Sequence, residues 1–396
     1  MSTPGGWTAP GQGPAQPDPR PQPGATADPV GSGPPLGSPS PPPHPPAGPP
    51  APQGWAQPRP VTYQPGVIPF RPLGMGDIYS AAFKIIKGNP ASTVGAALVI
   101  ALVALIPTTP LGLWVAQQGS GDLFDPAAPV DDSTATDAVL VTVGQYIPTI
   151  AGSLATVALA GFIAYVTGQA VLGRKVKLPE TWRGTRPHLL RVIGVSLLVS
   201  LLLFVVAAAF LAPGTALMVA GGTAGDETLL GVGLLTFLGL GLLLIPVVIF
   251  LWTRFAFVGP AIVLDQVGIG ASLRRSWQLT RFPGFWRILG IRVLTTLLLS
   301  IVAQILVLPV TVGLMAVVFA GGFGPEALVT MQVLIGAIAT LITAAATTPV
   351  TATVDTLLYV DQRMRTEALD VRLIQAVEGQ APLPWHPALD PHRATA

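Results

Sequence analysis

Six long apolar runs constrain this chain more than any other feature of its sequence. A helix needs about 20 apolar residues to cross the hydrocarbon core of a bilayer, and each of these runs is long enough. Half of the residues are hydrophobic and only 10% are charged, which is far from the composition of a soluble domain. The sequence therefore predicts an all-α integral membrane protein with six transmembrane helices, at about residues 91–116, 139–172, 189–212, 229–258, 288–319 and 327–359.

The two ends of the chain differ in kind from this membrane domain, which we place at residues 67–378. Residues 1–60 hold 21 of the 43 prolines, with abundant glycine, alanine and serine. Such a segment cannot bury enough apolar surface to fold, so residues 1–66 are predicted to be a disordered cytoplasmic tail and residues 379–396 a flexible tail. The run PSPPPHPPAGPP is either a solvated spacer or a polyproline II ligand for a cytoplasmic protein partner, and we favour the spacer.

Basic residues are confined to alternate connections between the runs. The connections at 117–138, 213–228 and 320–326 contain Asp or Glu but neither Lys nor Arg. Because Lys and Arg beside a span favour the cytoplasmic side, these three connections are predicted to be extracytoplasmic. With six spans, both termini are then cytoplasmic.

Two of the basic connections have the periodicity of amphipathic helices. In residues 75–87 and 269–281, apolar side chains fall on one face and charged or amide side chains on the other. A helix of this kind lies in the membrane interface, with its apolar face in the acyl boundary and its cations at the headgroups. Its basic residues also favour anionic membrane lipids as partners.

These connections mark an internal duplication. AFKIIK, TWRGTR and SWQLTR begin at residues 82, 181 and 276, and two apolar runs follow each. Three helix-hairpin repeats, each opening with a cytoplasmic interfacial helix, are therefore predicted at about residues 71–172, 173–264 and 265–360. The alternative is that any basic connection between spans looks similar, and the topology is the same in either case. The candidate lipid contacts in the three segments are Lys84, Lys87, Trp182, Arg183, Arg186, Arg274, Arg275, Trp277 and Arg281.

Three stretches carry a resemblance to a known family. RPLGMGDIYSAAFKIIKGNP (71–90), WTRFAFVGPAIVLDQVGIGASLRRSWQLTRFPGFWRILG (252–290) and TPVTATVDTLLYVDQRMRTEALDVRLIQA (348–376) are similar to uncharacterised actinobacterial multi-pass proteins of the glycerophosphoryl diester phosphodiesterase membrane domain family. The resemblance covers about residues 67–378 and implies a bacterial cell membrane. It implies architecture more than activity, because the catalytic barrel of the fused enzymes needs on the order of 250 residues and no such segment is present.

Residues that could carry chemistry are sparse. The chain has no cysteine, and its four histidines lack the spacing of a metal site. The membrane part shows no paired carboxylates, no nucleophile with a partnered base and no phosphate-binding glycine loop. We therefore expect no enzyme activity, no cofactor or metal, and no nucleic-acid partner.

Two classes of function remain. A non-catalytic scaffold or accessory protein of the cell membrane accounts for the absent chemistry, the basic cytoplasmic side and the proline-rich tail. A transporter or lipid-handling protein accounts for the repeats. The scaffold is favoured, because carriers usually place charges near the bilayer midplane, whereas Arg254 and Asp355 both fall near cytoplasmic ends of their runs.

Arg254 and Asp355 form the candidate intramembrane charge pair. Each lies in an apolar run, at a similar depth from the cytoplasmic side. A charge within a span costs about 2.5–3.5 kcal/mol on insertion scales, so each is expected to have a partner or a water-filled recess. The two side chains either pair with each other or are solvated separately, and we weigh the two readings equally.

Overall fold

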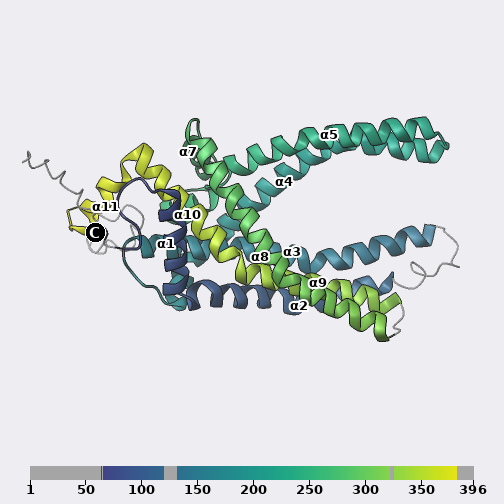
Figure 1. Ribbon diagram of the computed structural model, residues 1–396, viewed down its shortest axis with the longest axis horizontal. Helices are drawn as coiled ribbons and strands as arrows, with labels where there is room; N and C mark the ends of the chain where they lie inside the picture. The colour runs from purple at the N-terminus through teal and green to yellow at the C-terminus, as the bar shows by residue number, and fades with distance from the viewer. Residues whose placement is uncertain (1–63, 65, 120–131, 322–324, 381–396) are drawn as a thin grey trace, which may run out of the picture. The chain divides into compact units, whose positions relative to one another are not determined.

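The computed structural model describes residues 64, 66–119, 132–321 and 325–380, and every regular element in these ranges is a helix (Figure 1). The predicted all-α fold is confirmed for this part of the chain. Apart from residues 64 and 66, the predicted N-terminal tail lies outside the described residues, as does the C-terminal tail beyond residue 380. In chain order the elements are α1 (Met75–Gly88), a π-helical turn (Ala91–Gly95), α2 (Ala96–Gln118), α3 (Asp132–Val171), α4 (Leu178–Ala224), α5 (Glu227–Arg254), α6 (Val258–Asp265), α7 (Ile269–Leu279), α8 (Gly284–Gly321), α9 (Pro325–Ala346), α10 (Thr348–Glu367) and α11 (Leu369–Val377).

Six helices in the described ranges are long and apolar enough to cross a membrane, as predicted. Large apolar side chains cover their outer faces: Phe204 is 69% exposed, Leu235 72% and Phe319 73%. Apolar surface of this extent is rare on soluble proteins and fits a lipid environment. The fold is compatible with a multi-pass membrane protein. The candidate spans are Ala91–Gln118, Thr136–Val171, Leu178–Ala224, Glu227–Asp265, Gly284–Gly321 and Ala327–Ala346.

The spans pair as sequential hairpins. α2 packs along α3, α4 along α5 and α8 along α9, and α9 also packs against α2 and α3. The first hairpin depends on small residues, because a Cβ added at Gly144 would lie 2.6 Å from the Cβ of Ala116. The second hairpin turns at Gly225, whose φ is +66°, and Asp226 then caps α5 by accepting hydrogen bonds from two N–H groups of its first turn.

The segments that begin the three predicted repeats differ in structure. α1 and α7 are separate short helices, but TWRGTR forms part of the first turns of α4 and continues without a break into the span. The predicted separate interfacial helix of the second repeat is therefore wrong. Pro179 lies in the first turn of α4, where its missing N–H costs no helical hydrogen bond. The predicted connection at 213–228 is likewise mostly helical, since α4 runs to Ala224.

The sixth apolar run forms two helices, whereas the sequence predicted one. α9 ends at Ala346 and α10 begins at Thr348, with Thr347 between them at a φ of −101°. Pro349 explains the break, because a proline removes one backbone hydrogen bond and its ring clashes with the carbonyl four residues earlier. Only the part up to Ala346 qualifies as a span, so Asp355 lies on α10, beyond the sixth span.

The core lies where α1, α6, α7 and α10 meet, at the end of the hairpins opposite the α4–α5 turn (Figure 1). α10 runs through this core, since every residue from Thr356 to Met364 is buried. Ile78 and Ile85 of α1 pack into the same core. The predicted placement of this apolar face in lipid is therefore wrong for Ile78 and Ala82, which protein covers, whereas Met75 and Phe83 are 45% and 63% exposed.

Candidate functional site

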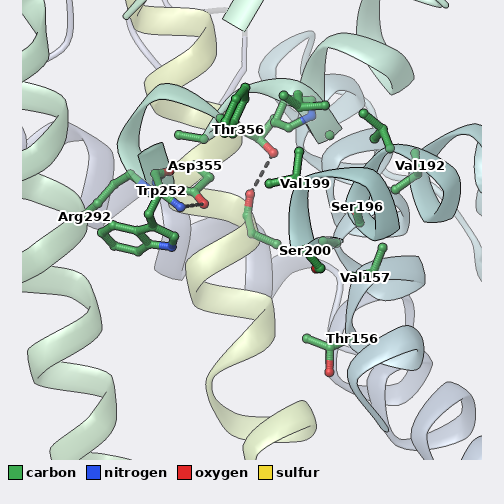
Figure 2. A pocket seen from close by; sticks show the side chains of 18 residues that line it. Thr156, Val157, Val192, Ser196, Val199, Ser200, Trp252, Arg292, Asp355 and Thr356 are labelled. Carbon is green, nitrogen blue, oxygen red and sulfur yellow. Dashed lines mark hydrogen bonds and ion pairs between the residues drawn. The ribbon is translucent and has the colours of Figure 1, made fainter. Parts of the chain in front are cut away.

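A bidentate ion pair joins α8 to α10 (Figure 2). Arg292 Nε lies 2.9 Å from Asp355 Oδ1, and Arg292 Nη2 lies 3.3 Å from Asp355 Oδ2. The remaining nitrogen, Nη1, donates to the Trp252 carbonyl at 2.6 Å, and the guanidinium carbon is 3.8 Å from the centre of the Trp252 rings. The Arg292 side chain is 9% exposed and that of Asp355 25%. Three charge-assisted hydrogen bonds and an aromatic face thus compensate a cation held within the fifth span.

Two cavities meet at this ion pair. The central cavity has a volume of about 460 Å³ and lies among α3, α4, α6 and α10, while the threonine cavity has a volume of about 250 Å³. Trp252, Arg292 and Asp355 line both, so the ion pair forms a partition between them. The other side chains labelled in Figure 2, which line the central cavity, are Thr156, Val157, Val192, Ser196, Val199, Ser200 and Thr356. Thr295, Thr296 and Thr351 complete the threonine cavity.

The lining of the central cavity suits a molecule with one apolar and one polar end. Valine side chains of α3 and α4 form an apolar wall, and hydroxyl groups and the ion pair gather at other points. Polar residues continue along α8 at four-residue spacing from Arg292, through Thr296 and Ser300 to Gln304, and these three are exposed on one face. Among the described residues, no group of three His, Cys, Asp or Glu side chains could hold a metal ion. The arrangement can bind and orient a ligand.

Arg254 does not pair with Asp355, so this prediction is wrong. Arg254 is the last residue of α5, and its Nη1 donates to the carbonyls of Trp277 at 3.3 Å and Thr280 at 2.9 Å, at the C-terminal end of α7. A helix C-terminus carries unpaired carbonyls and partial negative charge, so it accommodates a cation without a carboxylate. The guanidinium also faces the rings of Phe250, Trp277, Phe282 and Phe285, with centroids 4.8–5.7 Å away.

The true partner of Asp355 was missed, although the sequence held a signal for it. Arg292 is the single charged residue within the predicted fifth run, 288–319. It lies close to the predicted cytoplasmic end of that run, where a cation is common and draws no attention. A lone charge inside an apolar run needs a partner, and this argument applies to Arg292 as strongly as to Arg254.

A second group of charges, the Asp265 cluster, ties α6 and α7 to α10. Asp265 forms an ion pair with Arg275 at 2.5 Å and accepts from Arg363 at 2.6 Å and from the Tyr359 hydroxyl. Arg275 Nε donates to the Tyr359 hydroxyl at 2.9 Å, and Glu367 bridges the two arginines at 3.0 and 2.9 Å. The pKa of Tyr359 is raised, mainly by burial and also by the nearby Asp265 carboxylate, so its hydroxyl stays a donor. Burial alone would lower the pKa of Arg275, but Tyr359 and the two carboxylates raise it overall.

A third group, the Asp361 cluster, ties the segment before α1 to α8 and α10. Asp361 Oδ1 accepts from the Leu73 N–H at 2.7 Å, and its carboxylate pairs with Arg287 and, at 3.1 Å, with Arg365. The same two arginines donate to the Leu73 carbonyl at 2.6 and 2.9 Å. The RPLG and LLYVDQRMR stretches, which carried part of the family resemblance, are therefore bonded to each other.

Of the nine predicted lipid contacts, eight are exposed and Arg275 is not. Arg275 is wrong as a headgroup contact, because it is held in the Asp265 cluster. Trp277 is 40% exposed but also packs beside Arg254. The other seven exposed contacts are Lys84, Lys87, Trp182, Arg183, Arg186, Arg274 and Arg281.

Comparison with known proteins places the chain in a family. A model of the family of unknown function DUF7544 matches residues 89–361. The chain belongs to this family. The matched region includes Arg254, Arg292 and Asp355 and ends at Asp361. No curated protein and no solved structure matches it. The resemblance to the glycerophosphoryl diester phosphodiesterase membrane domain family stays a prediction that this match does not test.

Proposed function

We propose that this DUF7544 member is a non-catalytic membrane protein that binds an amphiphilic molecule between its hairpins, as a lipid-handling protein or a transporter. The central cavity carries this proposal, because its apolar wall leads to a buried ion pair that also lines a second cavity. The apolar part of the ligand would lie along Val157, Val195 and Val199, and its polar end would meet Arg292 and Asp355.

The cost of the ion pair favours this function over the scaffold that the sequence favoured. Taking two charges out of water costs several kcal/mol per ion, and replacing such a pair by apolar residues is often neutral or stabilising. A scaffold needs neither the pair nor the cavities beside it, whereas a ligand with a polar end uses both. The scaffold stays the second candidate, because exposed cations on α1, α7 and the start of α4 could bind a membrane surface or a protein.

Photo-crosslinking tests the amphiphile site. The purified protein is reconstituted in vesicles containing a phospholipid with a diazirine in its acyl chain, and adducts are mapped by mass spectrometry. We expect adducts on the cavity wall, at residues 156–160 and 192–200. Ser200→Trp fills the mouth of the cavity and should remove most of them, while Leu198→Trp, also exposed on α4 but outside the cavity lining, should not. Adducts confined to the outer faces of α5 and α8, or equal labelling of both variants, would favour the scaffold.

We also propose that the protein resides in a bacterial cell membrane with both termini cytoplasmic. Nine of the 18 described Lys and Arg residues lie on α1, α7, α10 and the start of α4, and five more lie in the segments just before α1 and α4 and just after α7, whereas the α4–α5 turn carries Asp226 and Glu227. The excess of Lys and Arg at one end of the spans supports this orientation. Alkaline phosphatase fused after residue 225 should be active, and fusions after residue 272 or 380 should be inactive. Activity at 272 would reverse the assignment for the third hairpin.

A further inference from the structure

An apolar groove lies on another part of the membrane domain, among α2, α3 and the start of α4. Its volume is about 530 Å³, and no residue that lines it also lines the central cavity. Val99 and Val103 of α2, Phe162 of α3 and Trp182 of α4 are among its walls, with the Phe162 and Trp182 rings 5.5 Å apart. All of the lining side chains are apolar or aromatic. A groove of this kind fits a hydrocarbon chain.

Three exposed cations neighbour lining residues of this groove in the sequence. Arg186 follows Trp182 by four residues and precedes Leu189 by three, so it lies on the face of α4 that lines the groove. Arg183 directly follows Trp182, and Lys177 directly precedes the lining residue Leu178. All three cations are exposed, so their charged ends can reach the headgroup region while their stems follow the apolar wall.

A side-chain hydrogen bond holds the first span beside the start of α4, where one carboxylate, Glu180, also lies. Ser92 donates to the Val176 carbonyl at 2.9 Å, which holds the start of the first span beside the residue that precedes Lys177. Lys87, at the end of α1, is exposed five residues before Ser92. Glu180, in the first turn of α4, is exposed as well, and the cations Lys177, Arg183 and Arg186 outnumber it there.

We propose that this groove is a binding site for an anionic phospholipid. One acyl chain lies between α2 and α4 against Trp182, and Lys177, Arg183 and Arg186 bind the phosphate and the anionic headgroup. The apolar lining would bind the acyl chain of any lipid, whereas the neighbouring cations would select an anionic headgroup.

Quenching by brominated lipids tests the site. The full-length protein is reconstituted with increasing fractions of dibrominated phosphatidylglycerol or dibrominated phosphatidylcholine, and the Trp182 contribution is the difference between the wild type and Trp182→Phe. We expect half-maximal quenching at a roughly fivefold lower mole fraction of phosphatidylglycerol than of phosphatidylcholine. This factor corresponds to the attraction of about one Lys or Arg near a membrane surface to an anionic headgroup. Arg183→Gln together with Arg186→Gln should abolish the preference.

Matched controls separate the site from general attraction to the membrane. Arg274→Gln together with Arg281→Gln removes two exposed cations of α7 and the residues after it, outside the groove, and should leave the preference intact. Val99→Trp, at a 53% exposed wall residue, should reduce quenching by both lipids. Equal quenching of Trp182 by the two lipids, or loss of the preference in the α7 variant, would overturn the proposal. Neither outcome bears on labelling of the central cavity.

Discussion

Replacing Arg292 by alanine should destabilise the protein by about 3 kcal/mol, because Asp355 is then left between two cavities without its counter-charge. The value is at the lower end of the usual range for a broken buried pair, since a quarter of the Asp355 side chain is exposed. Asp355→Ala should cost a similar amount. The double substitution should cost less than the sum by about 1–3 kcal/mol, since the second change removes a charge that the first has already left unpaired.

The matched control for this cycle is Arg254 with Asp355, the pair that the sequence suggested. Arg254→Ala removes hydrogen bonds to the end of α7 and contacts with four rings, none of which involves Asp355. The two single effects should therefore add within about 0.5 kcal/mol. Unfolding free energies are measured by adding SDS to the detergent-solubilised protein and following tryptophan fluorescence. Coupling in the Arg254 cycle, with none in the Arg292 cycle, would mean that Asp355 pairs with Arg254 and not with Arg292.

The spans could be predicted because the bilayer imposes one requirement on each of them. About 20 apolar residues are needed whatever the helix packs against, so hydropathy alone locates them. Their interruptions were harder to predict. Pro349 ends one helix and starts another, while Pro213 and Pro246 lie inside α4 and α5. A proline in an apolar run signals a kink or a break, and neighbouring helices decide which.

The partners of the charged residues could not be predicted from local sequence. Arg275 has the spacing of a headgroup contact, yet it binds Asp265 and Glu367, residues 10 and 92 positions away. An amphipathic pattern shows which side chains share a face, but not whether that face meets lipid or another helix. The same limit explains α1, where Ile78, Ala82 and Ile85 pack into the core. The cavities depend on six elements at once and have no signature in any one of them.

Asp361 should be the most sensitive carboxylate outside the spans. Its side chain is 0% exposed, and it pairs with Arg287 and Arg365 while accepting the Leu73 N–H. Asp361→Ala removes the carboxylate partner of Arg287 and Arg365, which keep the Leu73 carbonyl, and leaves the Leu73 N–H without an acceptor, so it should cost about 3–5 kcal/mol. Asp361→Asn keeps an acceptor for Leu73 but loses the charge, so its effect should be intermediate. Thermal unfolding of the detergent-solubilised protein measures both.

Asp77 is the reference for that experiment, because it is also a carboxylate paired with an arginine beside α1. Its pair with Arg71 is 3.2 Å long and largely exposed, and it also caps α1 through the Gly74 N–H. Asp77→Ala should therefore cost only about 1 kcal/mol. Limited proteolysis adds a second readout, since loss of the Leu73 contacts in Asp361→Ala should make residues 66–74 cleavable before the spans unfold. Equal melting temperatures for the two alanine variants, with residues 66–74 still protected, would mean that the Asp361 cluster does not anchor α1 to α10.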